Sequence, residues 1–181
     1  MIILASKSPR RKELLGQLIN EFEIIPPLIN EFLYPFEDLS KEKAKVVASN
    51  YPDAIIISAD TIVIKNNVVY GKPKDKLDAF RMLKELSNNV HQVKTVYSIY
   101  SQNKHIELTR IVTSKVYFNE LSDELISQYV DTLSPLDKAG AYGIQDEEFN
   151  LVNKIEGSYT NIVGLPIDEL KEDLIKLKII A

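Results

Sequence analysis

Hydrophobic and polar positions at the start of the chain follow a strand pattern and then a helix pattern. Residues 2–5 (IILA) form a continuous apolar run, which is typical of a short buried strand. Ser8 and Pro9 then suit the N-cap and first position of a helix over 9–18. The first unit is therefore predicted to be strand, turn and helix, with inner-face residues Leu14, Leu15 and Leu18.

The next segment is less regular. Three prolines among apolar residues in 22–37 predict a short strand followed by a loop that carries Glu31. The stretch DLSKEKAKVVASN then predicts a helix, with Lys41, Lys43 and Lys45 among its polar positions.

The strongest strand signal is AIIISADTIVIKNNVVYG, which contains two runs rich in β-branched residues. Asn66 and Asn67 separate the runs and tolerate left-handed backbone, so they predict a hairpin turn. The polar group Ser58 to Thr61 interrupts the first run and places the acidic Asp60 inside it.

The rest of the chain alternates between the hydrophobic periodicity of helices and that of strands. It predicts a helix near 75–87, strands near 90–101 and 105–118 joined at QNK, a helix beginning at Ser122, a loop over LDKAGAYGIQD, strands near 149–155 and 160–163, and a helix over 166–178. The apolar positions expected to face inward in the helices near 75–87 and 166–178 are Leu77, Phe80, Leu83, Leu86, Leu170, Leu174 and Leu177. Long hairpins in the middle fit a purely parallel sheet poorly, so we expect an α/β fold with a mixed, twisted sheet flanked by helices.

Composition narrows the class of protein. The 181 residues suffice for one domain with a sizeable core. No cysteine is present, and no apolar run reaches the roughly 18 residues of a membrane span, so we expect a cytoplasmic protein without disulfides or a membrane partner. A net charge of −4 offers no general basic face for nucleic acid, so any anion site must be local.

Arg10 and Arg11 occupy the first turn of the helix that begins after Ser8. Cations there are disfavoured by roughly 0.3–1 kcal/mol each, because the helix N-terminus is already positive. A bound anion would make the two cations favourable there, since free N–H groups, a hydroxyl and two guanidiniums would converge on it. The alternative is that both arginines are solvated, with Glu13 as a partner.

Asp60 is the second candidate for chemistry. A carboxylate inside a buried strand needs a cation or a metal as partner, unless it caps a turn between two strands. Lys72 in GKP follows the hairpin and could return near Asp60, although a solvated lysine is the simpler interpretation of that residue alone. His91 and His105 lack metal-ligand spacing, so each is expected to be a polar or core histidine.

Four blocks together closely resemble the Maf family of nucleoside triphosphate pyrophosphatases: LASKSPRRKELL, SADTIV, GKPKD with HQVKT downstream, and DKAGAYGIQD with IEGSYTNIVGLP. The resemblance covers residues 3 to about 170. It implies a single domain over 1–181, with two lobes around an elongated, twisted mixed sheet, similar to inosine triphosphate pyrophosphatases. It also implies nucleotide binding in a central cleft between the lobes.

The resemblance implies hydrolysis of a nucleoside triphosphate between the α and β phosphates with a divalent cation, Mg²⁺ or Mn²⁺. By motif, Asp60 matches the catalytic carboxylate, and Glu31 is carried over as a second acid that binds metal or orients water. The residues that the resemblance assigns to substrate binding are Ser8, Arg10, Arg11, Lys43, Lys72, Thr61 and Gln145.

The sequence resembles the branch that cleaves dTTP and UTP at three positions, Arg10, Thr61 and Gln145. Modified pyrimidine nucleotides are further candidate substrates. Asp146 and Asn88 stand where the family usually has glycine. Asp146 adds a negative charge near the expected base pocket, while Asn88 can adopt the same turn.

Several alternatives stay open at this point. The chain could be a nucleotide-sensing or cell-division binding module, a member of the 7-methyl-GTP branch, or a phosphatase that releases single phosphates. A homodimer is an expectation that rests on the family alone.

Overall fold

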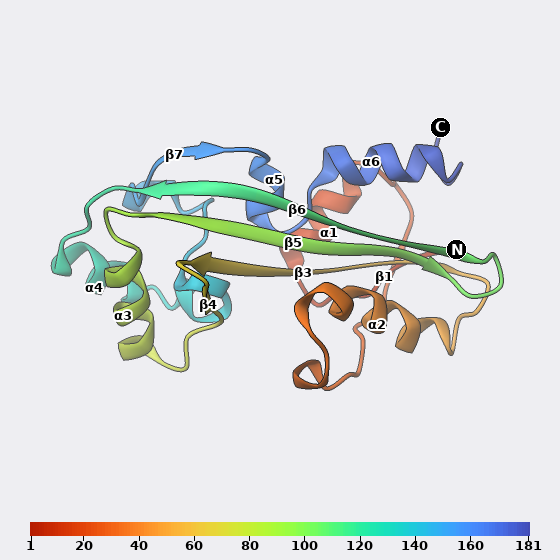
Figure 1. Cartoon of the computed structure of the whole chain (residues 1–181), viewed down its shortest axis with the longest axis horizontal. Helices are drawn as coiled ribbons and strands as arrows, with labels where there is room; N and C mark the ends of the chain where they lie inside the picture. The colour runs from red at the N-terminus through yellow and green to blue at the C-terminus, as the bar shows by residue number, and fades with distance from the viewer. The chain divides into compact units, whose positions relative to one another are not determined.

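The computed structural model describes all 181 residues and contains one mixed sheet of seven strands (Figure 1). The strand order is β2-β1-β3-β5-β6-β7, and β4 pairs with β3 outside that path. The strands are β1 (Ile2–Leu4), β2 (Glu23–Ile24), β3 (Ile55–Lys65), β4 (Val68–Tyr70), β5 (Val90–Ser101), β6 (Ile106–Phe118) and β7 (Val152–Glu156).

Six α-helices and four short 3-10 helices join these strands. The α-helices are α1 (Pro9–Gly16), α2 (Phe36–Ala48), α3 (Lys76–Leu86), α4 (Asp123–Asp131), α5 (Tyr159–Val163) and α6 (Ile167–Lys176). The 3-10 helices are η1 (Glu31–Leu33), η2 (Ser134–Asp137), η3 (Ala139–Ala141) and η4 (Glu147–Phe149). None of the helices is long and apolar enough to cross a membrane.

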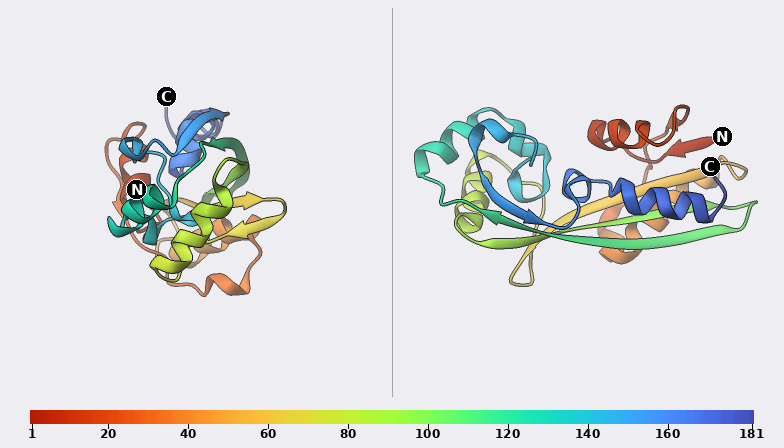
Figure 2. Two further views of the ribbon diagram at one scale, coloured as in Figure 1. Left: turned by 90° about the vertical axis from the view of Figure 1, so that its left-hand side faces the viewer. Right: turned by 90° about the horizontal axis from the view of Figure 1, so that it is seen from above.

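The sheet combines parallel and antiparallel pairs, as predicted. β1 is parallel to both of its neighbours, with Ile3 opposite Glu23 of β2 and opposite Ile56 of β3. The pairs β3 with β4 and β6 with β7 are antiparallel. The long strands β5 and β6 run side by side as a hairpin (Figure 2), within one residue of the predicted ranges.

The chain divides into two compact units. The first comprises Met1–Asp60, Thr95–Val112 and Gly164–Ala181, and the second comprises Thr61–Lys94 and Thr113–Val163. The boundaries fall inside β3, β5 and β6, so each of these strands contributes residues to both units. The cleft expected between two lobes stays a prediction.

In the first unit, helices cover the sheet on two sides. Figure 1 shows α2 on one side of the strands and α6 on the other. Ala44, Val47 and Ala48 lie at helical spacing on α2 and pack against Ile3 and Ile56 of the sheet. Burial of this apolar stripe fixes the rotation of α2 about its axis and thereby the direction of its polar side chains.

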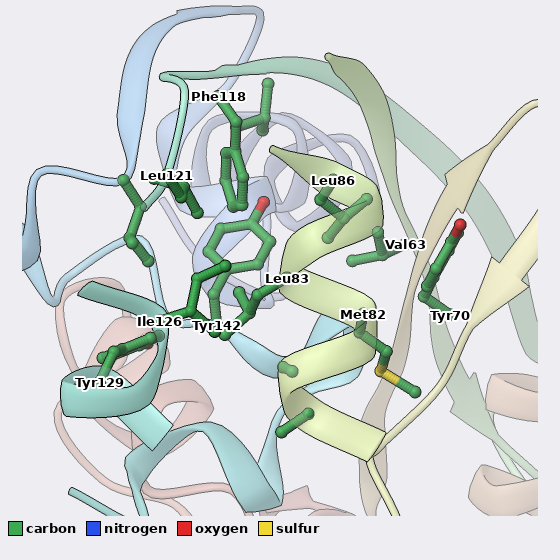
Figure 3. Packing of buried hydrophobic residues seen from close by; sticks show 14 of the residues in the cluster. Val63, Tyr70, Met82, Leu83, Leu86, Phe118, Leu121, Ile126, Tyr129 and Tyr142 are labelled. Carbon is green, nitrogen blue, oxygen red and sulfur yellow. The ribbon is translucent and has the colours of Figure 1, made fainter. Parts of the chain in front are cut away.

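The core of the second unit packs around α3 (Figure 3). The buried stripe of α3 is Ala79, Met82, Leu83 and Leu86. Leu77, expected to face inward, is 79% exposed, so that assignment is wrong. Positions 79, 82, 83 and 86 follow the i, i+3, i+4, i+7 pattern of one helical face, and Leu77 lies off it.

A second correction concerns residues 160–163, which were expected to form a strand. They belong to the helix α5 instead. The hydroxyl of Ser158 accepts a hydrogen bond from the N–H of Asn161 at 3.1 Å, and the Asn161 amide donates to the Val93 carbonyl at 3.1 Å. Local capping and this tertiary contact therefore override the strand propensity of a short β-branched run.

Two predicted turns are confirmed by backbone geometry. Asn66 and Asn67 have φ values of 50° and 64°, as the hairpin between β3 and β4 requires. Asn88 has φ of 55° after α3, so it adopts the left-handed turn for which the family usually uses glycine.

Candidate active site

Asp60 lies within β3, in the first unit. The strand continues on both sides of it, so the interpretation as a turn-capping residue between two strands is wrong. Its side chain is 12% exposed and points toward α2, where it pairs with Lys43. A buried carboxylate in a central strand is thus matched by a cation, as its burial requires.

Lys43 joins both candidate acids. Its ammonium group donates a short hydrogen bond to Asp60 Oδ1 and lies 2.7 Å from Glu31 Oε1. The Lys43 side chain is only 9% exposed, unlike Lys41 and Lys45 on the same helix. Three residues from α2, β3 and η1 therefore form one cluster, and all three are among the residues that the family resemblance assigns to the site.

A chain of hydroxyl groups fixes α2 against the sheet next to this cluster. Ser58, two residues before Asp60 on the same strand face, donates a hydrogen bond to the Ser40 carbonyl. Ser40 Oγ lies 2.7 Å from Ser98 Oγ of β5, which lies 2.8 Å from Thr109 Oγ1 of β6. Sequence analysis missed these residues, although the spacing of Ser40 and Lys43 places both on one helical face.

The environment raises the pKa of Asp60 above its ordinary value of 3.8. Burial is the main cause, and the negative charge of Glu31 acts in the same direction, whereas Lys43 and Arg11 oppose the shift. Asp60 Oδ2 is buried and has no hydrogen-bond partner, so one oxygen retains its full acceptor capacity. Asp60 thus combines a raised pKa with a free acceptor atom, which suits a general base.

Arg11 brings a second cation toward the same acids. Its Nε donates to the Gly164 carbonyl at 2.8 Å, which fixes the direction of the guanidinium. Burial and the neighbouring Arg10 lower the pKa of Arg11, while Asp60 and Glu31 raise it, and burial dominates. These mutual effects place Arg11, Asp60 and Glu31 within electrostatic range of one another.

Ser8 caps the helix that carries both arginines. Its hydroxyl oxygen accepts the N–H of Arg11 at 3.3 Å, as expected for an N-cap, and its own N–H donates to Ser6 Oγ at 3.1 Å. The first turn of α1 contains no acidic residue. The N-terminus of α1 and its two arginines therefore concentrate positive charge, and Arg11 interacts electrostatically with both acids.

Thr61, Lys72 and Gln145 belong to the second unit, so their roles as substrate contacts stay predictions. Thr61 follows Asp60 on β3, and strand alternation directs the two side chains to opposite faces. Lys72 is exposed between β4 and α3, and Gln145 is exposed in the turn before η4.

The second unit contains a cavity of about 350 Å³ beside that turn. Its lining residues are Gly143, Ile144, Asp146, Glu147, Asn150, Leu151, Val152, Lys154, Ile155 and Tyr159. The Asp146 carboxylate accepts hydrogen bonds from Tyr129 at 2.6 Å and from Ser134 at 3.1 Å. The charge that Asp146 adds at this position is therefore held by two protein donors.

His91 is a core residue, as expected. Its Nε2 lies 2.7 Å from the Tyr142 hydroxyl, and its ring packs edge-on against Phe118. Burial lowers the pKa of His91 from 6.5 to about 4, so the ring is neutral at pH 7. His105 lies in the turn between β5 and β6 with φ of 53°.

A family model described as "Maf-like protein" matches residues 1–177. The chain belongs to the Maf family. It is 45% identical to the dTTP/UTP pyrophosphatase of Carboxydothermus hydrogenoformans over 179 residues, which cover 96% of each chain. It is 43% identical to the dTTP/UTP pyrophosphatase of Aquifex aeolicus, covering 99% of this chain and 97% of that one.

The fold of this Maf chain is similar to that of the Staphylococcus aureus Ham1 protein. The TM-score is 0.57 at 15% sequence identity, covering 97% of this chain and 98% of that chain. At this identity the likeness concerns the fold alone, and it agrees with the expected mixed, twisted sheet flanked by helices.

The acids of this Maf chain offer few ligands for a metal ion. No group of three or more His, Cys, Asp or Glu side chains has the arrangement of a metal site. Mg²⁺ in phosphate-processing sites is commonly held by one or two carboxylates together with phosphate oxygens and water. Asp60, with its unpartnered Oδ2, and Glu31 fit that smaller donor set.

Proposed function

We propose that this Maf-family chain hydrolyses dTTP and UTP to the nucleoside monophosphate and pyrophosphate. The observation that carries the proposal is the buried carboxylate of Asp60, with a raised pKa and one free oxygen, set beside the cations of Lys43 and Arg11. The relatives named dTTP/UTP pyrophosphatase, at 43–46% identity over nearly the whole chain, support it.

Hydrolysis of a phosphoanhydride needs a positioned water and neutralisation of charge more than covalent chemistry. Asp60 Oδ2 accepts the proton of the attacking water, because it is the carboxylate oxygen that Lys43 leaves free. Lys43 holds Oδ1 and thereby fixes the plane of the carboxylate. Glu31 anchors the other side of the same ammonium group.

Positive groups stabilise the polyphosphate as charge moves onto the departing pyrophosphate. Arg10 and Arg11 extend from the N-terminal turn of α1, and the positive end of the helix dipole there also favours anions. The Ser8 hydroxyl oxygen accepts from the Arg11 N–H, which leaves its own proton to donate to a phosphate oxygen. Lys72 of the second unit is proposed as a further phosphate contact.

We include a divalent cation, Mg²⁺ or Mn²⁺, in the proposal, with Asp60 and Glu31 as the residues that would hold it. When bound, such an ion supplies charge neutralisation at the phosphate oxygens and acidifies bound water. Gln145 is proposed to hydrogen-bond the edge of the pyrimidine base, which would distinguish dTTP and UTP from purine nucleotides.

A substrate panel tests this proposal. The purified protein is incubated with dTTP, UTP, 7-methyl-GTP and inosine triphosphate in the presence of Mg²⁺, and pyrophosphate and orthophosphate are measured separately. Pyrophosphate from dTTP and UTP is the expected result. Orthophosphate would indicate a phosphatase, a preference for 7-methyl-GTP would indicate the other branch, and no product at all would favour a binding module.

A further inference from the structure

The turn that carries Gln145 is closed by its own first and last residues. The N–H of Asp146 donates to the Gly143 carbonyl at 3.1 Å, so Gln145 is the third residue of a four-residue turn. Gln145 is exposed, and no hydrogen bond of its own side chain holds the turn in place. The position of Gln145 therefore depends on what fixes Gly143 and Asp146.

One hydroxyl group contacts both ends of this turn. Tyr129 on α4 (Figure 3) is fully buried. Its oxygen accepts the N–H of Gly143 at 2.9 Å, and its proton is donated to Asp146 Oδ2 at 2.6 Å. The turn is thus attached to α4 at its first and fourth residues through a single atom.

Other contacts restrict the turn further. Ser134 Oγ donates to the same Asp146 oxygen at 3.1 Å, and Lys138 Nζ donates to the Ser134 carbonyl at 2.7 Å. A Cβ atom at Gly143 would lie 2.9 Å from Lys138 Cε and 3.2 Å from Asp146 Oδ2. The backbone of the turn therefore has little free space on this side.

The chemistry of Tyr129 suits a permanent donor. Burial and the neighbouring Asp146 raise the pKa of its hydroxyl, so the proton stays in place throughout the neutral range. The ring packs against Phe149 at a centroid distance of 4.8 Å, which keeps the hydroxyl in one position. Both properties favour the two hydrogen bonds that hold the turn.

We propose that the Tyr129 hydroxyl is a positioning group for nucleotide recognition, which orders the Gly143–Asp146 turn so that Gln145 meets the base without further rearrangement. This inference rests on the proposed function, in which Gln145 contacts the base. Asp146 belongs to the same device: its carboxylate is the acceptor that orients the tyrosine proton, and it does not act as a free charge against the nucleotide.

Tyr129→Phe removes the hydroxyl and keeps the ring. The matched control is Tyr97→Phe, because Tyr97 is also fully buried and donates to a carboxylate, Asp173, at 2.5 Å. Both variants lose a buried tyrosine–aspartate hydrogen bond, and Tyr129→Phe also removes the acceptor of the Gly143 N–H, so both unfolding midpoints should fall, that of Tyr129→Phe by at least as much. Only Tyr129→Phe loosens the turn that carries Gln145.

Calorimetry with the α,β-methylene analogue of dTTP in the presence of Mg²⁺ measures binding without turnover. Tyr129→Phe is expected to raise Kd about fivefold to tenfold, the range for loss of a hydrogen bond that orders a binding group. In steady-state assays with dTTP, KM should rise with kcat nearly unchanged, because the base contact stabilises ground state and transition state alike. Tyr97→Phe should leave both Kd and KM near the wild-type values.

A double-mutant cycle separates positioning from general destabilisation. In a Gln145→Ala background, Tyr129→Phe should change Kd by less than about twofold, because the residue through which it acts is already absent. An unchanged Kd in Tyr129→Phe, or an equally large effect without Gln145, would overturn the inference. If the wild-type protein binds the analogue but releases no pyrophosphate from dTTP, only the proposed hydrolysis is refuted. If the wild-type protein neither binds the analogue nor cleaves dTTP, both proposals are refuted.

Discussion

At the scale of single residues, Asp60 shows how burial and charge together prepare a carboxylate for proton transfer. Burial raises its pKa, and the ammonium group of Lys43 limits that rise. Without Lys43, an ionised carboxylate inside β3 would be poorly compensated. Burial therefore leaves Asp60 more basic than an exposed aspartate, while Lys43 favours its ionised form.

This balance predicts a shift in the pH dependence of kcat/KM. Lys43→Met removes the attraction that lowers the pKa of Asp60, so the acidic limb of the profile should move to higher pH. Lys41→Met is the control, since Lys41 lies on the same helix and approaches only Glu107, at 3.9 Å. An unshifted limb in Lys43→Met would show that Asp60 is not the group that must be deprotonated.

Sequence reasoning singled out Asp60, Arg10 and Arg11 because their types are unusual where they occur, whereas Lys43 and Glu31 followed only from the family resemblance. Asp60 interrupts a buried strand, and Arg10 and Arg11 occupy a helix turn that disfavours cations. It did not identify Ser40, Ser58, Ser98 or Thr109, because serine and threonine are common in helices and strands alike. Only the tertiary packing of α2 on the sheet places these hydroxyls in one chain.

At the scale of elements, the N-terminus of α1 connects stability with phosphate binding. The Ser8 hydroxyl oxygen caps the helix by accepting the Arg11 N–H. Loss of an N-cap hydroxyl costs about 1 kcal/mol of stability. The same loss should loosen the turn from which both arginines extend.

Ser8→Ala and Ser122→Ala test this connection as a pair. Ser122 caps α4 with the same geometry, by accepting the Leu125 N–H at 3.1 Å. Both variants should lose about 1 kcal/mol of unfolding free energy in urea titrations. Only Ser8→Ala should raise KM for dTTP, and equal KM values for the two variants would contradict the role assigned to the α1 N-terminus.

Elements with strong local signals were predicted well. Ser8 with Pro9, the Asn66-Asn67 turn and the acidic first turn after Ser122 all mark ends that the structure confirms. The segment 160–163 was misassigned because a five-residue helix leaves no room for a helical period to show. The N-cap at Ser158 is the local signal that marks the start of this helix.

At the scale of the whole molecule, local patterns predicted the mixed sheet and not its order. β1 lies between β2 and β3, and its pairing with β3 joins residues about 50 positions apart. Hydrophobic periodicity shows which face of a strand is buried, but it does not specify the neighbouring strand. The division of β3, β5 and β6 between two units likewise has no local signal.

The stability of the folded chain should depend on pH through His91. Its pKa is lowered to about 4 in the folded state, so the unfolded state takes up the proton first as pH falls. The contribution is fully present above pH 6.5 and is lost on the way to pH 4, a decrease on the order of 3 kcal/mol.

Urea unfolding of His91→Phe at several pH values between 4 and 7.5 tests this dependence. The variant should show a flatter change of unfolding free energy than the wild type. The control is His105→Asn, which removes an exposed histidine and should keep the wild-type slope. Asparagine tolerates the left-handed backbone of that turn, so the fold is retained. If the unfolding free energy of His91→Phe changed with pH as steeply as that of the wild type, the pH dependence would come from other groups.

The central claim is that Asp60 activates water against a bound nucleoside triphosphate, and one measurement tests it most directly. Pyrophosphate release from dTTP is followed for the wild type, for Asp60→Asn, and for Asp53→Asn, in which an exposed aspartate is changed. The account predicts that Asp60→Asn lowers kcat by about 10²- to 10⁴-fold while nucleotide binding stays measurable, and that Asp53→Asn behaves as the wild type. Pyrophosphate release by Asp60→Asn at the wild-type rate would contradict it.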